Sequence, residues 1–222
     1  MHQPTHSIGF PLSGEWVAVN TPAEKIPSHG TDFFGQRYAF DFARLNAKGT
    51  GFSRRSVFRQ FTFFVRASDF WAWDEPVFAA FNGKVIAAED GWPDRMIINA
   101  LWQVIRATFI QGRPQPSDLR SLLGNYLLIE GEPGVALYAH LRSGSVLSRT
   151  GQLVQAGERL GSVGNSGNST MPPLHFHVMD RANPWEAEGV YCDFTTGEPG
   201  AIPIVPPLMK PFRARPRQPG DA

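Results

Sequence analysis

The stretch LHFHV at residues 174–178 is the feature that most limits how this chain can fold. Its bulky apolar residues, Leu174, Phe176 and Val178, alternate with His175 and His177. A period of two is typical of a β-strand with one face in a hydrophobic core. Both imidazoles are therefore expected on the opposite face, where one could bind a metal and the other act as an acid or base.

Two histidines on one strand face have two equally good interpretations. They could form part of a metal site, or they could be half-exposed polar residues on an edge strand. The chain has six histidines, and the four outside the N-terminal leader are His29, His140, His175 and His177. Each of these four lies in a local sequence that suits a site, which favours the first interpretation.

The composition excludes several classes of protein. The 222 residues, 42% of them hydrophobic, suffice for one domain with an insertion. A formal net charge of +1 argues against nucleic acid and anionic membranes as partners. No apolar run reaches the ~18 residues of a membrane span. The single cysteine, Cys192, excludes an intrachain disulfide.

The chain divides into a leader at residues 1–12, a domain at 13–202 and a Pro/Arg-rich tail at 203–222, which we expect to be disordered. The first residues show no basic region followed by an apolar stretch, so no signal peptide is visible. By sequence alone this predicts a cytoplasmic protein.

Abundant glycine, proline and phenylalanine predict a mainly β domain of short strands joined by turns. The clearest alternation marks strands at 15–20, 38–44, 125–130 and 135–141. Two further strands in PVFAAFNGKVIAAEDG meet at Asn82-Gly83, which is a typical hairpin dipeptide.

Residues 93–123 interrupt this β pattern and predict a helical insertion. Apolar residues recur at helical spacing within 94–111, after a proline and before a glycine. A second, shorter helix is expected at 118–123, with Ser117 as its N-cap and Gly124 at its end.

Two polar residues stand out within the predicted strands. In residues 38–43, aromatic residues alternate with small ones and with Asp41. A carboxylate flanked by alanines has room beside it, so a ligand position is as good an interpretation as an exposed strand residue. In residues 135–141, the same period places His140 on the face of Tyr138.

The order of the motifs resembles that of the lysostaphin-like (LytM-like) zinc metallopeptidases, which cut peptide bonds in bacterial peptidoglycan. The resemblance covers most of residues 13–180 and is carried by His29, YAFDF, PVFAAFNGKVIAAEDG, GNYLLIE, LYAHL, GQLVQAGERLGSVGNSG and LHFHV. It implies a compact antiparallel β-sheet or sandwich with one catalytic zinc ion.

Carried over to this chain, the resemblance implies that His29, Asp41 and His175 bind the zinc and that His140 is a catalytic histidine. The gap between His29 and Asp41 is longer than is usual in the family. Asp32 is therefore an alternative ligand, although Asp41 has the more suitable strand context.

A further departure lies at Pro173, where the family has a second catalytic histidine two residues before its third ligand. His177, on the same strand face as His175, is the candidate to take over this catalytic work. A register shifted by two residues is the other possibility, with His175 catalytic and His177 as the ligand.

The resemblance implies hydrolysis of peptide bonds in peptidoglycan cross-links through a zinc-activated water. We expect a monomer with a peptidoglycan or peptide substrate, in the cell envelope or secreted if the family location holds. Two alternatives remain. One is a catalytically impaired relative that acts as a metal-containing binding or regulatory module. The other is a nonenzymatic β domain with an aromatic groove around Trp71 and Trp73.

Overall fold

The computed structural model describes residues 3–56, 64–99, 119–197 and 201–217. The helical elements are the 3-10 segments η1 (Phe33–Tyr38) and η2 (Ala67–Asp69) and the helix α3 (Leu119–Leu123). The strands are β1 (His6–Gly9), β2 (Gly14–Asn20), β3 (Phe40–Ala43), β4 (Val65–Arg66), β5 (Pro76–Phe78), β6 (Gly83–Glu89), β7 (Ile97–Ile98), β8 (Asn125–Gly131), β9 (Gly134–Leu141), β10 (Leu153–Val154), β11 (Arg159–Ser162), β12 (Leu174–Met179), β13 (Gly189–Val190), β14 (Cys192–Thr195) and β15 (Phe212–Ala214).

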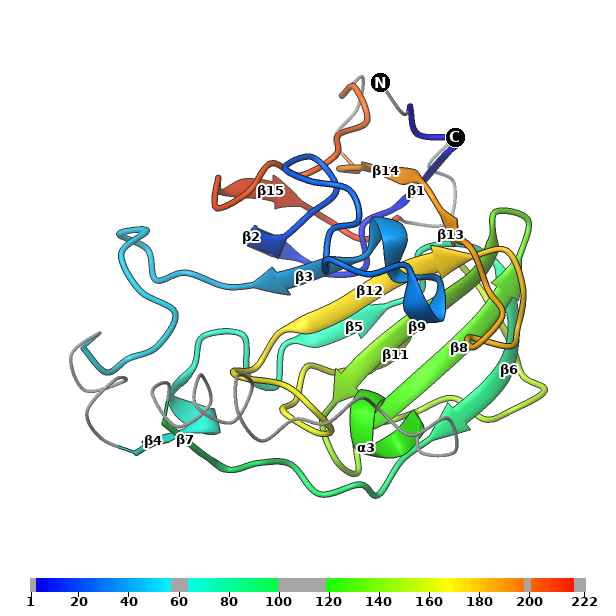
Figure 1. Ribbon diagram of the computed structural model, residues 1–222. Coiled ribbons are helices and arrows are strands. Elements are labelled where there is room, and N and C mark those ends of the chain that lie inside the picture. Colours follow the sequence, from blue (N-terminus) through cyan, green and yellow to red (C-terminus); the bar gives the residue numbers. More distant parts are fainter. Residues whose placement is uncertain (1–2, 57–63, 100–118, 198–200, 218–222) are drawn as a thin grey trace.

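One large antiparallel sheet dominates the molecule (Figure 1). Its strand order is β10-β6-β8-β9-β12-β3-β2-β15, and β13 pairs with β12 beside this path. The strands β8, β9 and β12 lie at the middle of the sheet, and η1 lies over β12 (Figure 1). The predicted fold class, a mainly β domain with antiparallel strands, is confirmed.

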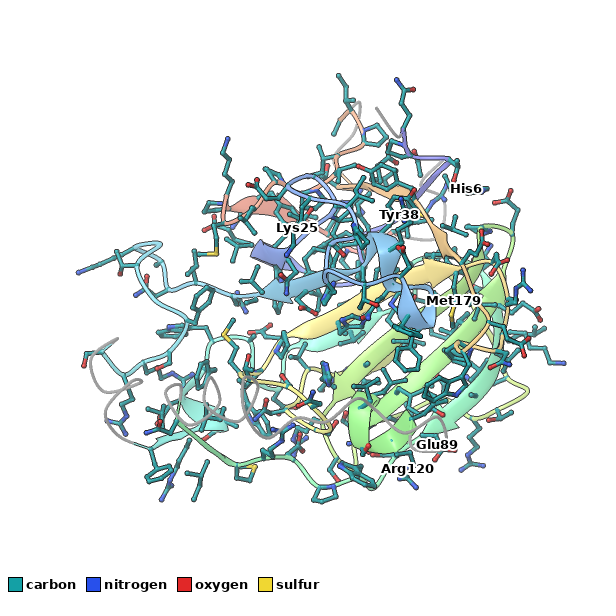
Figure 2. The ribbon with its side chains drawn as sticks, in the orientation of Figure 1. His6, Lys25, Tyr38, Glu89, Arg120 and Met179 are labelled. Carbon is teal, nitrogen blue, oxygen red and sulfur yellow. The ribbon has the colours of Figure 1, made fainter. Side chains whose placement is uncertain are left out.

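The two faces of this sheet cover different clusters of apolar side chains. Leu174, Phe176 and Val178 of β12 belong to the main core on one face. Leu137 of β9 and Met179 of β12, the latter labelled in Figure 2, belong to a smaller cluster on the other face. The alternation in LHFHV therefore forms the strand that the sequence predicts, and His175 and His177 lie on the face of the smaller cluster.

Strand β9 contains a β-bulge at its end. Leu127 of β8 pairs with Tyr138, but the next pair joins Asn125 to Leu141, so β9 has one extra residue. His140 takes up this residue with a left-handed φ of 62°. The bulge reverses the alternation: Leu141 enters the main core with Tyr138, and His140 turns to the opposite face. The prediction that His140 and Tyr138 share a face is therefore wrong.

The Asn82-Gly83 turn does not join a hairpin. Strand β5 pairs with β11, whereas β6 pairs with β8 and β10. The Asn82 side chain instead accepts a hydrogen bond from the amide of Ala156 at 2.8 Å. A turn dipeptide signals a local change of direction, but the pairing of the flanking strands depends on distant segments.

The predicted helical insertion is only partly described. Residues 94–99, expected to begin a helix, instead form a bridge at Asp94 and the short strand β7. Residues 100–118, including Ser117, lie outside the described part. The second predicted helix is confirmed as α3, and Gly124 follows it with a left-handed φ of 67°. Arg120 of α3 forms an ion pair with Glu89 at the end of β6 (Figure 2), with 3.5 Å between Nη1 and Oε2.

Both ends of the described chain pair with the body of the domain. Residues of the predicted leader form β1, which runs parallel to β14. The tail forms β15, which pairs with β2, and Ala214 is buried in the main core. The prediction of a disordered tail is wrong for residues 201–217, because this pairing and burial lie beyond what local composition indicates. Within the described part of the chain, no helix has the length and apolar character needed to span a membrane.

Candidate metal centre

The centre of the site is a row of polar residues across neighbouring strands. His175 of β12 pairs directly with Asp41 of β3, and Asp41 pairs in turn with Asn20 at the end of β2. Directly opposite residues in an antiparallel sheet place their side chains within contact distance on the same face. His175 Nδ1 lies 2.8 Å from Asp41 Oδ1, and Asn20 Nδ2 donates to Asp41 Oδ2 at 2.7 Å.

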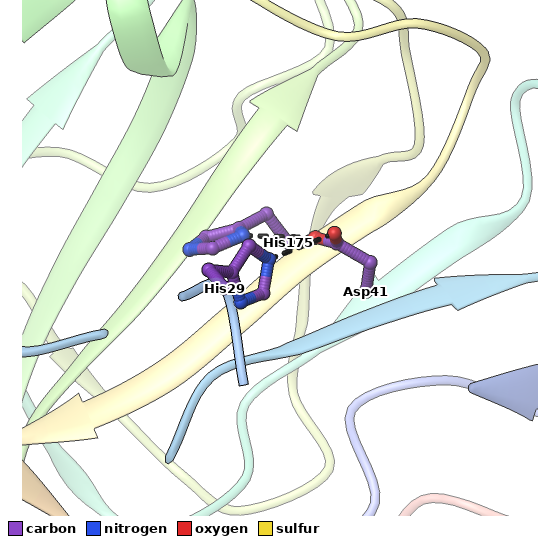
Figure 3. Close-up of side chains that lie close together, drawn as sticks. All are labelled: His29, Asp41 and His175. Carbon is purple, nitrogen blue, oxygen red and sulfur yellow. Dashed lines mark hydrogen bonds and ion pairs between the residues drawn. The ribbon is translucent and has the colours of Figure 1, made fainter. Parts of the chain in front are cut away.

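His29 joins this row from the loop before η1. Its Nε2 lies 2.9 Å from Asp41 Oδ2. The side chains of His29, Asp41 and His175 point toward one another in Figure 3, and one ligand atom of each lies within 4.8 Å of the other two. Residues distant in the chain thus converge on one point, and they are the three that the family resemblance implies as ligands.

The structure distinguishes the two candidate carboxylates. Asp32 is exposed and forms an ion pair with Arg37 at 2.8 Å. It is therefore engaged outside the cluster, whereas Asp41 contacts both histidines. Asn20, by contrast, was not indicated by the sequence, because its role depends on the pairing of β2 with β3.

His177 lies on the side of His175 that faces away from Asp41. Its Nδ1 is 3.1 Å from His175 Nε2, its Nε2 is 2.9 Å from the Phe34 carbonyl oxygen, and it is only 1% exposed. Both ring nitrogens are thus engaged within the protein. This position does not suit the predicted acid-base role of His177, nor the shifted register in which it would be a ligand.

His140 lies on the other side of His175. The centroids of the two rings are 5.9 Å apart. The Nδ1 of His140 is 2.9 Å from the carbonyl oxygen of Ser166, so this nitrogen donates and Nε2 carries the lone pair. The bulge in β9 therefore orients His140 toward the metal-ligand candidates.

A groove of about 1000 Å³ opens beside the cluster. The residues that line it come from β2, β3, β9 and β12, from η1 and its flanking loops, from α3, and from the turn before β12 and the loop after it. Besides His29, Asp41, His140 and His175, they are Asn20, Thr31, Phe33, Phe34, Gln36, Leu122, Leu123, Asn168, Ser169, Thr170, Pro173, His177 and Trp185.

Two sequence expectations bear on this groove. Pro173 lines it, so the position at which the family resemblance implies a second catalytic histidine faces the site. Trp71 and Trp73 are not among its lining residues. Trp73 instead packs against a separate apolar cluster that contains Phe70. The groove beside the metal-ligand candidates is therefore not the aromatic groove expected around these two tryptophans.

The electrostatics of the site favour an ionised Asp41 carboxylate and neutral rings at His140 and His177. Burial by itself would raise the pKa of Asp41, but hydrogen bonds from His175 and His29 outweigh it and hold that pKa well below its usual value. Burial, reinforced by the positive charge that His175 can carry, lowers the pKa of His140 to about 4. The same causes hold the pKa of His177 well below its usual value.

The donor set fits zinc. Two imidazole nitrogens and one carboxylate oxygen are the kind and number of protein ligands that catalytic zinc sites use, with a fourth position left for water or substrate. Asn20 and His177 bond to the ligands from outside, as the supporting residues of metal sites do. The arrangement is poorly suited to calcium or magnesium, which prefer oxygen ligands.

An antiparallel β domain in which two histidines and an aspartate converge beside a groove has the form of a metal-dependent hydrolase. A family model described as Peptidase family M23 matches residues 66–187, more than half of the chain. The chain belongs to Peptidase family M23. The matched stretch contains His140, Pro173 and His175, whereas His29 and Asp41 lie before it.

Two curated relatives from Vibrio cholerae serotype O1 (strain ATCC 39315 / El Tor Inaba N16961) match a shorter stretch. Peptidoglycan DD-endopeptidase ShyA is 38% identical over 65 residues, which cover 29% of this chain and 15% of ShyA. Peptidoglycan DD-endopeptidase ShyB is 39% identical over 64 residues, with the same coverage of 29% and 15%. The similarity thus spans a small part of either relative.

Among solved structures, the catalytic domain of lysostaphin from Staphylococcus simulans is similar over 83% of this chain and 88% of that chain. The sequence identity is 18% and the TM-score is 0.38.

The lowered histidine pKa values predict acid sensitivity of the metal-free protein. An unfolded histidine binds its proton near pH 6.5, whereas folded His140 stays neutral down to about pH 4. The unfolded state therefore binds more protons in this window, so the free energy of unfolding should fall as the pH drops from 6.5 to 4. For His140 alone the loss amounts to at most about 3 kcal/mol. Urea denaturation across this range measures it.

The matched variants for this measurement are His140→Gln and His6→Gln, the second in β1 outside the site. His140→Gln should flatten the pH dependence of the free energy of unfolding, because its side chain does not titrate. An unchanged slope in His140→Gln would contradict the burial of a neutral ring at this position.

Proposed function

We propose that this chain is a zinc-dependent metalloendopeptidase that hydrolyses peptide bonds in peptidoglycan cross-links and acts as a monomer. The observation that carries the proposal is the convergence of His29 Nε2, the Asp41 carboxylate and His175 Nδ1 beside a groove. Membership of Peptidase family M23 supports the reaction. The similarity to ShyA and ShyB, both peptidoglycan DD-endopeptidases, supports the substrate class.

Zinc held by His29, Asp41 and His175 would supply a Lewis acid that polarises the scissile carbonyl group and activates a water molecule near neutral pH. Other side chains of the protein would bind the peptide and transfer protons.

In this proposal, His140 transfers the proton. Its Nδ1 donates to the Ser166 carbonyl oxygen, so Nε2 can accept a proton from the attacking water. The same nitrogen can then return the proton to the leaving amine. Because burial keeps the ring neutral above about pH 4, His140 is in the accepting form at neutral pH.

The groove is suited to an uncharged stretch of peptide. Among its described lining residues, Asp41 is the only one with a carboxylate, ammonium or guanidinium group. Gln36 and Ser169 offer hydrogen-bonding groups. The rings of Phe34 and Trp185, whose centroids are 4.3 Å apart, form an apolar wall. A peptide with small side chains beside the scissile bond could bind here through its backbone.

A second candidate function follows from Pro173. This residue faces the groove where the family resemblance implies another catalytic histidine, and it has no group that can transfer a proton. The second candidate is therefore a zinc-containing binding or regulatory module that recognises the same peptides but hydrolyses them slowly or not at all.

The metal site predicts that the purified chain binds about one zinc ion per chain. Asp41→Ala should lose the metal, because Asp41 lies between the two histidines. Asp32→Ala is the matched control and should keep it, since Asp32 pairs with Arg37 outside the cluster. Elemental analysis after dialysis measures the zinc content. Metal retained in Asp41→Ala but lost in Asp32→Ala would show that the wrong carboxylate was assigned.

The proposed reaction predicts that the chain cleaves cross-linked peptidoglycan, that a chelator stops the cleavage and that added zinc restores it. His140→Ala should lower kcat by about 10²- to 10⁴-fold, the range for a positioned acid-base group, while the zinc content stays unchanged. Release of peptide fragments and metal analysis of the same samples measure both. Cleavage that survives the chelator would contradict the proposal.

The two candidate functions make opposite predictions for Pro173→His. An impaired module should gain hydrolysis, by about 100-fold if the new histidine acts as a positioned acid or base. A competent peptidase that relies on His140 should gain little. The assay compares kcat of the wild type, Pro173→His and Pro173→Ala, the last of which removes the proline ring without adding an imidazole.

A further inference from the structure

The two candidate histidine ligands are each hydrogen bonded on the side that faces away from Asp41. For His175 the neighbour is His177, whose Nδ1 lies 3.1 Å from His175 Nε2. The other nitrogen of His177 lies 2.9 Å from the carbonyl oxygen of Phe34 in η1. The contacts form a chain from His175 through His177 to a main-chain carbonyl.

The matching chain for His29 runs through a hydroxyl group. His29 Nδ1 lies 3.0 Å from Ser28 Oγ, and Ser28 Oγ lies 3.4 Å from the carbonyl oxygen of Gln36. Ser28 is fully buried. Both chains therefore end on carbonyl groups of the same 3-10 segment, η1.

A carbonyl oxygen can only accept hydrogen bonds, so it sets the direction of each chain. His177 must carry its proton on Nε2 to donate to Phe34, which leaves its Nδ1 as an acceptor. His175 then donates from Nε2. By the same reasoning, Ser28 donates to Gln36 and accepts from His29 Nδ1.

We propose that His177 and Ser28 are positioning residues that fix the tautomers of His175 and His29. When the metal is bound, the two chains keep the protons on the outer nitrogens, and Nδ1 of His175 and Nε2 of His29, which face Asp41, are the atoms left for the metal. The inference rests on the proposed zinc site, and it assigns His177 to support of the metal ligands in place of proton transfer to substrate.

The conformation of η1 supports this role. Phe34 has a left-handed φ of 62°, which is unfavourable for a residue with a side chain and is found where the surroundings impose it. The Phe34 carbonyl oxygen lies within hydrogen-bonding distance of His177 Nε2. The Phe34 ring packs against Trp185, with 4.3 Å between the ring centroids. Residues that orient metal ligands in this way typically change metal affinity by 10- to 100-fold when they are replaced.

Zinc affinity measured with a competing chromophoric chelator tests the proposal. His177→Phe keeps a ring but has no acceptor for His175, so its affinity should fall by about 10- to 100-fold. His177→Asn retains an oxygen near the position of Nδ1 and should recover most of the affinity. Ser28→Ala should also weaken binding, whereas Ser148→Ala, another buried serine, is the matched control and should not.

Equal affinity in His177→Phe and the wild type would overturn the proposal, and so would a His177→Asn variant that binds zinc as weakly as His177→Phe. A second measurement applies to the wild type alone and does not depend on the variants folding. Nitrogen-15 NMR of the histidine rings should show His177 protonated on Nε2 and not on Nδ1 in both the metal-free and the zinc-loaded protein, and His175 protonated on Nε2 in the zinc-loaded protein. A proton on His177 Nδ1 in either form, or an unprotonated His175 Nε2 in the zinc-loaded protein, would overturn the proposal.

These measurements separate the proposal from the proposed function. A chain that binds no zinc refutes the zinc peptidase, and the NMR experiment on the metal-free protein still decides whether His177 donates from Nε2 to the Phe34 carbonyl oxygen, on which the positioning role depends. A chain that binds zinc equally well in the wild type, His177→Phe and Ser28→Ala keeps the proposed function and refutes the positioning role.

Discussion

The structure depends on the antiparallel pairing of β12 with β3, which sets His175 directly opposite Asp41. Side chains alternate between the two faces of a sheet, so a slip of one residue would send His175 into the main core and Phe176 into the groove. The burial of Phe176 in the main core therefore fixes the same register that builds the site. Core packing and ligand geometry are two results of one pairing.

The strand pairing also explains how Asp41 and its polar neighbours can lie partly or fully buried at one place. An unpaired charge in a protein interior is costly, and a carboxylate is stable there only with partners. Asp41 has partners on three sides, from Asn20, His29 and His175. Removing one of these groups would leave the others less well satisfied, so the cluster behaves as a unit.

The sequence alone predicts the features that depend on short-range periodicity. The strand with His175, the strand with Asp41 and the short helix before Gly124 are all of this kind. A hydrophobic alternation or a glycine after a helix is a local physical signal, and the structure contains these elements where the pattern places them.

The remaining features depend on contacts between distant segments, which leave no periodic trace. The bulge that turns His140 toward the site is held by Asn125, whose buried side chain donates to the Leu141 carbonyl oxygen at 2.9 Å. The role of Asn20 requires the pairing of β2 with β3. The pairing of the proline-rich tail as β15 is likewise set by a strand from the other end of the chain.

Two of the three candidate ligands lie outside the stretch that matches the family model. The match to the family model begins at residue 66, yet His29 and Asp41 lie earlier in the chain, in the loop before η1 and in β3. A segment cut at the family boundary and grafted onto another protein would carry His175 without the two other candidate ligands. The smallest segment that carries all three candidate ligands is thus longer than the stretch that matches the family model. It must include β3 and the loop before η1.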